Sequence, residues 1–398
     1  MSATAYLLHL ISGERMQNLL PLLALQPRRV IQLCSDDAKI LAAAAHTEAA
    51  ARQAGIHAEF QIHKLPSASP TTEQVRHAHK QLIAVFPGAV VNITGGTKLM
   101  SLGAYLGASE FHDSPILYCD TVNRQFVQVG KAPLPPQMLP FREVAAMLTV
   151  PIVMAAQGKA FREDSITPGL LEFGRAAWDL RTHHHEAIAA WTAQIRKAVP
   201  RRSDGRIEKS KTTLTGFLAA SLPFPESDAA QDYLDAAVQA GLLTVDAVGR
   251  VIMTAEPKPS SIERVSNLLD GAWLELAVAA MAARGRRYGD IHWSVQPPDQ
   301  AGADYGETDL IAVDREQLNL AVISCKTSTE HVKTLEHLSS WRDRARTLGG
   351  SHASGHLCLF RARDENEAAR LLSMGSTMGV HVHIGDEIPT HFAHSGGP

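Results

Sequence analysis

The chain has few cysteines and no long apolar segment. The first observation argues against a cysteine-ligated zinc site, and the second against a membrane-spanning protein. Its four cysteines, Cys34, Cys119, Cys325 and Cys358, are far apart, and none belongs to a Cys-x-x-Cys pair. A zinc site is therefore not indicated, and reduced thiols in a cytoplasmic protein are expected. No apolar run approaches the ~20 residues of a membrane helix. No signal-type segment opens the sequence, so no membrane partner is expected.

The chain also lacks an excess of charge of either sign. It has 38 Lys and Arg residues against 41 Asp and Glu residues, a formal net charge of -3. Contact with nucleic acid would therefore depend on a local basic strip. Candidates for that strip are Arg284, Arg286, Arg287, Lys326, Lys333, Arg342 and Arg344. With 398 residues, 45% of them apolar, the chain is long enough for two or three globular domains.

One glycine-paired turn, Thr94-Gly95-Gly96-Thr97-Lys98, lies between an apolar run at 90–93 and a helical pattern. A strand, a glycine turn and a helix in this order suit an anion, because backbone N–H groups and the helix N-terminus point at the ligand. Lys98 adds a full positive charge. The spacing is not that of a Walker A loop. The alternative is a tight structural turn with a solvated lysine.

The first 135 residues alternate between strand and helix patterns, which predicts a Rossmann-like α/β domain with a parallel sheet. The predicted strands cover 4–12, 30–34, 58–62, 89–93, 115–119 and 125–129. Ligands of such folds bind beyond the carboxyl ends of the strands. Polar turns at 12–16, 35–37 and 94–98 follow three of these strands. A ligand site is therefore expected where the three turns meet.

Residues 136–260 are predicted to form a mainly helical connector. Helical patterns at 142–158, 168–180, 185–198, 212–222 and 227–241 precede a short hairpin at 242–245 and 251–253. Helices followed by a hairpin suggest a winged-helix-like module, for which a spacer or dimer element is favoured over independent DNA binding. The three consecutive histidines at 183–185 point in different directions, which disfavours a metal site. A linker is expected at 257–261.

Residues 261–398 are predicted to form a second α/β domain. A helix is expected at 262–284, strands at 293–295, 309–313, 320–324, 356–360 and 380–384, and further helices at 328–348 and 366–374. The strand at 380–384 is expected at an edge of the sheet.

An acidic residue on one predicted strand and a lysine on the next form a candidate catalytic site in this domain. Read as a hairpin, Asp309 comes close to the end of the next strand, where Ser324 and Lys326 share one face. Asp309 would ligate Mg²⁺ or Mn²⁺ together with the carbonyl of Cys325, and Lys326 would stabilise the phosphoryl charge. Glu275, from a helix, would complete a metal-dependent phosphodiesterase. The alternative is three unrelated surface side chains.

At this point the residues resemble a known family. The turn at 94–98 is similar to the signature of CRISPR-associated Rossmann-fold (CARF) sensor domains. Residues 261–398 resemble nucleases of the PD-(D/E)xK, restriction-endonuclease-like class. Together with Trp273-Leu274-Glu275 and Trp341-Arg342-Asp343, the chain is similar to the ancillary nucleases of type III CRISPR antiviral defence that cyclic oligoadenylate activates.

The resemblance implies a homodimer that binds one cyclic tetra-adenylate across its two-fold axis and cleaves DNA, RNA or both. It implies that these residues line the ligand pocket: Ser12, Gly13, Met16, Ser35, Asp36, Thr94, Gly95, Gly96, Thr97 and Lys98. The sensor would occupy 1–135 and the nuclease 261–398.

One position departs from the class motif, which has Asp or Glu where this chain has Ser324. Glu275, Glu307 or Glu330 would have to supply the second carboxylate, or the nuclease is inactive and only binds. Two other functions stay open: a ligand-responsive DNA-binding regulator, and a ring nuclease that degrades the cyclic messenger at the turn 94–98.

Overall fold

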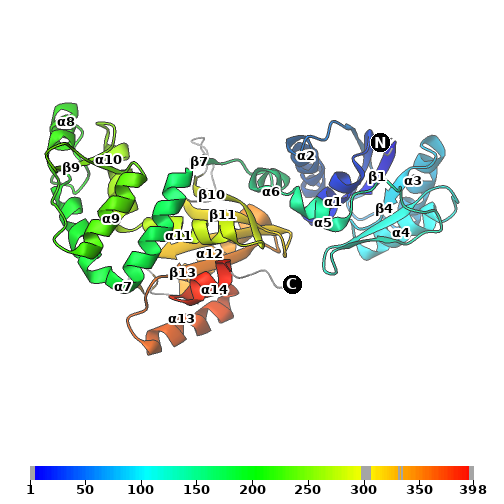
Figure 1. Cartoon of the computed structure of the whole chain (residues 1–398). Helices are drawn as coiled ribbons and strands as arrows, with labels where there is room; N and C mark the ends of the chain where they lie inside the picture. Colours follow the sequence, from blue (N-terminus) through cyan, green and yellow to red (C-terminus); the bar gives the residue numbers. More distant parts are fainter. Residues whose placement is uncertain (1–4, 297–305, 330–331, 333–334, 394–398) are drawn as a thin grey trace.

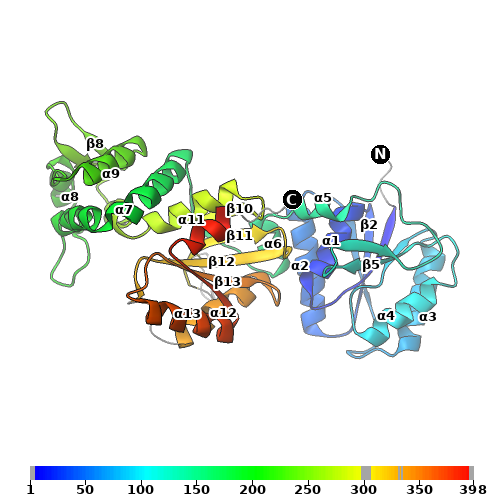
Figure 2. The same cartoon turned by 60° about the horizontal axis from the view of Figure 1, so that its bottom comes forward.

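The computed structural model describes residues 5–296, 306–329, 332 and 335–393. It contains two six-stranded sheets and one two-stranded hairpin. In space, the N-terminal sheet lies at one end of an elongated molecule, the C-terminal sheet in the middle and the hairpin module at the other end (Figures 1 and 2). The spatial order therefore differs from the chain order, in which the hairpin module comes second.

The N-terminal sheet confirms the predicted Rossmann-like parallel arrangement. Its strand order is β3-β2-β1-β4-β5-β6, and only β6 is antiparallel to its neighbour. The strands are β1 (Tyr6–Leu10), β2 (Arg29–Cys34), β3 (Glu59–Lys64), β4 (Val90–Asn92), β5 (Ile116–Asp120) and β6 (Gln125–Gln128). The helices are α1 (Arg15–Leu25), α2 (Ala38–Gln53), α3 (Thr72–Val85) and α4 (Lys98–Ala108).

The order of the strands brings the three polar turns together. β1 lies between β2 and β4, and all three run parallel, so the turns after them lie side by side at one edge. The contact between the first and third turns is very close. A Cβ on Gly95 would overlap the carbonyl oxygen of Leu10, and Gly96 has a φ of +78°. Both glycines are thus needed for the backbone path of the third turn.

Residues 142–158, predicted as one helix, form two. α5 (Phe141–Ala146) ends before Met147, and α6 (Val150–Ala156) begins after Thr149, whose hydroxyl accepts a hydrogen bond from Ile152 N–H. α6 packs against α2 on one side and the C-terminal sheet on the other, so a continuous apolar core joins the two sheet domains.

The predicted connector contains a longer helix than expected. The patterns at 168–180 and 185–198 form one element, α7 (Pro168–Ala198), which kinks at the non-helical residue His184. α8 (Lys211–Ala219), α9 (Asp228–Gln239) and the hairpin of β8 (Leu243–Val245) and β9 (Val251–Met253) follow, as the sequence predicted. α7 packs closely on α11 (Trp273–Arg284), where a Cβ on Gly174 would overlap the backbone of Leu276.

The second sheet has the order β14-β13-β12-β11-β10-β7. Its strands are β7 (Arg162–Asp164), β10 (Tyr288–Gln296), β11 (Thr308–Asp314), β12 (Asn319–Lys326), β13 (Ser354–Leu359) and β14 (Val380–Ile384). β14 is an edge strand, as predicted. The other edge strand, β7, comes from the segment predicted as connector, where no strand was expected.

The helices of this region also differ from the sequence pattern. The predicted helix 262–284 is two helices, α10 (Pro259–Asp270) and α11, bent by 69°. The linker predicted at 257–261 ends earlier than expected, because α10 begins at Pro259 and includes residues 259–261. α12 (Leu335–Gly349) begins seven residues after the predicted start at 328, α13 (Glu365–Met378) covers the predicted helix 366–374, and α14 (Glu387–Ala393) was not predicted.

No single helix in the described ranges is long and apolar enough to cross a membrane. The bent pair of α10 and α11 meets that test jointly, by length and composition only.

The close approach at Gly95 gives the first prediction. Gly95→Ala should lower the free energy of unfolding by about 1–3 kcal/mol, because the new methyl group must displace the backbone of Leu10. The matched control is Gly13→Ala, whose methyl group would meet no described atom within 4 Å. Urea denaturation of the full chain measures both. Equal stability of the two variants would contradict the structure of this turn.

Candidate functional site

Asp309 on β11 lies beside the end of β12, as the sequence predicted. The antiparallel register pairs Leu310 with Ile323, which places Asp309 next to Ser324. One carboxylate oxygen, Oδ2, accepts three hydrogen bonds: from Ser324 Oγ at 3.0 Å, Cys325 N at 2.7 Å and Lys326 Nζ at 3.2 Å. These donors fix the orientation of the carboxylate. Its other oxygen receives no hydrogen bond from any described residue.

Glu275 approaches the same place from the first turn of α11. Its Oε2 accepts a hydrogen bond from Trp293 Nε1 at 2.6 Å. Burial and the nearby charge of Asp309 raise the pKa of Glu275 to about 8, against the opposing effects of Trp293 and Lys326. The two carboxylates are thus close enough to repel each other, and the structure brings Glu275, Asp309 and Lys326 together.

Glu307 is a third carboxylate beside them. Its charge also raises the pKa of Glu275, and its Oε1 accepts a hydrogen bond from Ser294 Oγ at 2.9 Å. Of the three residues considered as substitutes for the acid missing at Ser324, Glu275 and Glu307 are therefore near Asp309. Glu330 lies outside the described residues.

Two side chains of α12, Trp341 and Arg344, lie beside Lys326. The Trp341 ring of α12 lies 5.8 Å from Lys326 Nζ and 4.8 Å from the Arg344 guanidinium carbon. Arg344 also donates to the carbonyl of Glu307. Burial lowers the pKa of Arg344, while the charge of Asp309 opposes that shift. Two positive charges thus face the carboxylates.

The other members of the predicted basic strip are placed differently. Arg287 pairs with the buried carboxylate of Asp314, 2.7 Å away at the opposite end of β11 from Asp309. Arg284 is in the last turn of α11 and Arg286 follows it, whereas Glu275 is in the first turn of the same helix. These two arginines are therefore at the other end of α11 from the site. Arg342 pairs with its neighbour Asp343 at 3.0 Å. Lys333 lies outside the described residues.

Cys325 contributes its backbone rather than its thiol. Its N–H donates to Asp309, while burial raises the pKa of the thiol, which packs in the core beside Cys358. Its carbonyl as a metal ligand stays a prediction.

In the N-terminal domain, the residues predicted to bind the ligand fall into two groups. Ser12, Ser35, Thr94 and Met16 are buried. The Thr94 hydroxyl donates to Asn92 Oδ1 at 2.6 Å and accepts from Cys119 N at 2.7 Å, so it ties β4 to β5. Gly95 is also buried, against the backbone of Leu10, and the exposed members are Gly13, Asp36, Gly96, Thr97 and Lys98.

Two of the exposed members have defined surroundings. The Thr97 hydroxyl caps α4 by accepting from Met100 N at 3.3 Å. Lys98 begins α4 and forms no hydrogen bond or ion pair with the residues that the structure describes. Its charge is therefore available to a ligand at the three turns.

The first turn also reaches the C-terminal domain. Glu14 accepts a hydrogen bond from Ser351 Oγ at 2.8 Å and lies 3.6 Å from His352 Nε2. Beside this contact is a cavity of about 250 Å³, lined by Met16 and by the turn between β11 and β12 at 316–319. Sequence reasoning missed Glu14, because the contact joins residues more than three hundred positions apart.

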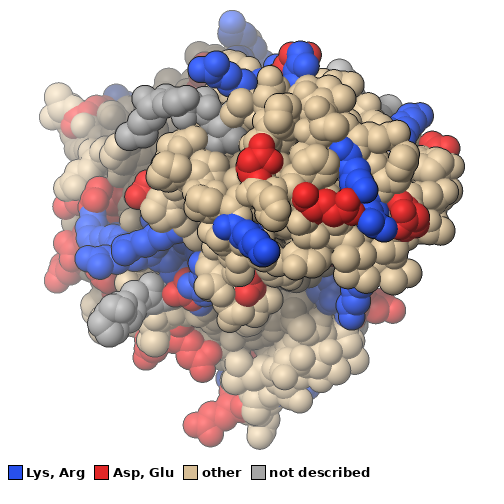
Figure 3. All heavy atoms as spheres, turned by 90° about the vertical axis from the view of Figure 1, so that its right-hand side faces the viewer, with Lys and Arg blue, Asp and Glu red and all other residues tan. Residues whose placement is uncertain are grey.

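α4 carries an exposed apolar stripe. Leu99, Leu102 and Leu106 are 62%, 47% and 39% exposed. This helix lies at the end of the molecule that Figure 3 shows, where broad areas carry no charged group. Such a stripe beside the ligand turns is suited to protein–protein contact.

The raised pKa of Glu275 gives a pH prediction for the metal-free chain. The folded state holds a proton on Glu275 up to pH about 8, whereas the unfolded state releases it near pH 4.5. Stability from this residue is therefore complete below the unfolded pKa and falls as pH rises toward 8, by about 1.4 kcal/mol per pKa unit.

Glu275→Gln should accordingly flatten the fall in stability between these pH values, as denaturation across pH in the presence of EDTA would measure. The control is Glu263→Gln, an exposed residue on α10. An unchanged pH profile for Glu275→Gln would contradict the buried, repelled carboxylate.

Comparisons with known proteins bear on the N-terminal domain and on the fold. Residues 36–137 match the family described as the Card1 CARF domain. No curated protein sequence matches the chain. Two solved structures share its fold over 98% of its length. Can2 from Sulfobacillus thermosulfidooxidans, solved in complex with cyclic tetra-adenylate, is 18% identical over 97% of its own chain, with a TM-score of 0.62. Protein VC1899 from Vibrio cholerae is 19% identical over 96% of its chain, with a TM-score of 0.67. The N-terminal domain is therefore similar to a CARF domain over residues 36–137, and the whole chain has the fold of these two proteins.

Proposed function

We propose that this chain is a metal-dependent nuclease that cyclic oligoadenylate activates in type III CRISPR antiviral defence. The observation that carries the proposal is the convergence of Glu275, Asp309 and Lys326 at the ends of β11 and β12. The CARF match and the cyclic tetra-adenylate bound to Can2 support the class of activator. The restriction-endonuclease-like type of the C-terminal domain is part of the proposal.

The residues at the site fit a divalent cation. Glu275, Asp309 and Glu307 supply carboxylate oxygens, the ligands that Mg²⁺ and Mn²⁺ prefer. Without a cation, the charge of Asp309 helps to hold Glu275 in its protonated form. A bound Mg²⁺ or Mn²⁺ would polarise the scissile phosphate and lower the pKa of a bound water. The repulsion between the carboxylates favours a cation between them.

The protein's own groups would orient and stabilise the reacting phosphate. Lys326 Nζ, held 3.2 Å from Asp309, would face the developing negative charge. Arg344 lies beside it across the Trp341 ring, suited to a flanking phosphate. Ser324 replaces a carboxylate of the class motif and donates to Asp309, so the second acidic ligand comes from Glu275, with Glu307 as the neighbour that can substitute.

Sensing would take place at the three turns of the N-terminal domain. The Gly95–Gly96 backbone, the start of α4 and Lys98 form a positive edge suited to phosphodiesters. Glu14 then links the first turn to the segment that follows α12, the helix that carries Trp341 and Arg344. A ligand that moves the first turn would thereby move α12, and with it Trp341 and Arg344 beside Lys326.

A homodimer is part of this proposal. The apolar stripe of Leu99, Leu102 and Leu106 begins one residue after Lys98. Pairing of two such stripes would place two sets of ligand turns about one axis, as a cyclic ligand requires. A cytoplasmic location is also part of the proposal, because the proposed activator and substrates belong to type III CRISPR defence.

The DNA-binding regulator has less support. α9, in the position of a recognition helix, carries Asp228, Asp232 and Asp235 and no lysine or arginine. Three carboxylates on that helix would repel the DNA backbone. The basic loop at 200–210 is left as a candidate contact for nucleic acid in this module, so the spacer interpretation is favoured.

The first functional prediction concerns Lys326. Lys326→Ala should slow cleavage by about 100-fold or more, because one positive charge at the transition state is lost. Plasmid nicking and RNA cleavage with Mn²⁺ and cyclic tetra-adenylate measure this change. Lys131→Ala, on an exposed loop of the N-terminal domain, is the matched control. Cleavage by Lys326→Ala at the parent rate would exclude this site.

The second concerns Lys98. Lys98→Ala should raise the cyclic tetra-adenylate concentration needed for half-maximal cleavage by about tenfold, the equivalent of ~1.4 kcal/mol. The rate at saturating ligand should stay the same, since Lys98 lies outside the nuclease site. Lys131→Ala, on an exposed loop of the same domain, is the control.

The same assay separates the other functions. Linear oligoadenylate that accumulates without polynucleotide cleavage would favour the ring nuclease. Ligand-dependent protection of a DNA segment without cleavage would favour the regulator.

A further inference from the structure

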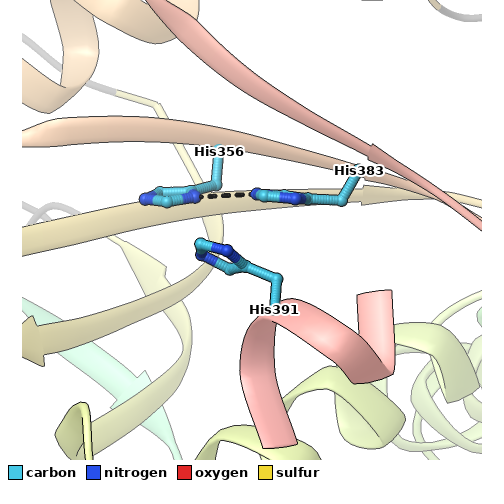
Figure 4. Close-up of side chains that lie close together, drawn as sticks. All are labelled: His356, His383 and His391. Atoms are coloured by element: carbon cyan, nitrogen blue, oxygen red, sulfur yellow. Dashed lines mark hydrogen bonds between the residues drawn. The ribbon is translucent and has the colours of Figure 1, made fainter. Parts of the chain in front are cut away.

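Three histidines from separate elements meet at the edge of the C-terminal sheet. They are His356 on β13, His383 on β14 and His391 on α14 (Figure 4). His356 is 1% exposed and His383 8% exposed, and His391 is half-buried. One ring nitrogen of each lies within 4.8 Å of those of the other two. The proposed nuclease function uses none of the three.

We infer that His356, His383 and His391 form a binding site for one zinc ion. Three imidazoles are a common donor set for Zn²⁺, with Zn–N distances of about 2.0–2.1 Å and roughly tetrahedral angles. Such geometry separates ligand nitrogens by about 3.3–3.4 Å. His356 Nδ1 and His383 Nε2 are 3.1 Å apart, so the spacing of this pair already suits a shared ion.

The outward ring nitrogens of two of these histidines are held by hydroxyl groups. His356 Nε2 lies 2.9 Å from Ser354 Oγ, and His391 Nε2 lies 2.8 Å from Tyr288 Oη. Metal-bound histidines almost always donate their second N–H to an oxygen acceptor, usually a carboxylate, a backbone carbonyl or a water, and a hydroxyl oxygen can accept in the same way. These contacts leave Nδ1 of both rings, together with His383 Nε2, as the nitrogens available to bind the ion.

The fourth coordination position would face solvent. An open hollow of about 570 Å³ borders the cluster and is lined by His383, His391, Asp386, Glu387 and Thr390. A water molecule or one of its two carboxylates can complete the coordination. The ion would replace the proton now shared between His356 and His383, and that proton would leave to solvent.

The site is separate from the proposed nuclease centre. His356 pairs with Ile323 in the neighbouring strand, three residues before Lys326, which is about 10 Å along the strand. The ligands differ as well, since imidazoles suit Zn²⁺ and carboxylates suit Mg²⁺ or Mn²⁺. A bound zinc would clamp α14, a helix of seven residues, to the strands β13 and β14.

The sequence could not indicate this site by spacing. His356 and His383 lie 27 positions apart. His391 follows on a helix that the sequence pattern did not predict. The adjacent pairing of β13 and β14, with His356 opposite His381, brings the first two rings together.

The experiment uses the full chain purified with a removable tag that contains no histidine and stripped with a chelator. Equilibrium dialysis against Zn²⁺, with metal analysis of the protein, measures binding. A Co²⁺ titration reports tetrahedral geometry by visible absorption. We expect one tightly bound Zn²⁺ per chain and a higher melting temperature in its presence.

The variants separate this site from other sources of binding. His391→Ala and His383→Gln should each weaken Zn²⁺ binding by about 100-fold, since even outer-shell changes at metal sites cost about 10- to 100-fold. Asp309→Ala should keep it. His381→Ala is the matched control, because it removes the imidazole beside His356 on β14 that is not part of the cluster.

Circular dichroism confirms that each variant is folded, and the half-buried position of His391 favours that result. Parent protein that binds no Zn²⁺, or folded His391→Ala and His383→Gln that bind it like the parent, would overturn the inference. Loss of binding in Asp309→Ala with retention in His391→Ala would assign the ion to the nuclease centre instead.

Discussion

The packing of α6 between the two sheet domains is the constraint on which the rest of the molecule depends. Its seven residues contact α2 of the N-terminal domain and the strands β10 to β12 of the C-terminal sheet. Asp290 of β10 accepts a hydrogen bond from Val150 N–H at 2.6 Å, which fixes the start of the helix. The two sheets thus share one apolar core rather than a flexible tether. Relative motion of the domains must therefore repack this helix.

The same rigidity explains how carboxylates can be held close together. Glu275 is fixed by α11, which packs on α7 through Gly174, and Asp309 is fixed by three hydrogen bonds. Glu275 is further held by its hydrogen bond from Trp293 Nε1. Burial, and after it the nearby charge of Asp309, raises the pKa of Glu275. Fold stability supplied elsewhere keeps an unfavourable arrangement in place.

Much of the fold follows from local patterns in the sequence. The alternation of strands and helices was sufficient for the N-terminal sheet, and the strand spacing placed Asp309 beside Ser324 and Lys326. The patterns failed where tertiary contacts decide. The break between α10 and α11 lies inside one apolar helical pattern, and β7 is a strand because β10 offers it a free edge. Local propensity carries no signal for such long-range pairing.

In the candidate site too, some contacts follow from local sequence patterns and others depend on long-range packing. Asp309 and Lys326 could be paired because a hairpin brings neighbours in sequence together. The contact of Glu14 with Ser351 and the approach of Glu307 to Glu275 depend on the packing of distant elements. The histidine cluster forms only when the parallel strands β13 and β14 pair and α14 packs beside them. No residue spacing encodes these relations.

The strand β7 has a consequence for how such proteins can evolve. It pairs with β10 although the hairpin module separates the two in the chain. A gene segment for residues 261–398 alone would leave the edge of β10 uncovered and the face of α11 without α7. The C-terminal domain could therefore not be exchanged by recombination at that boundary. Transferable units would have to begin before Arg162, so α7 and the hairpin module are inherited together with the C-terminal sheet.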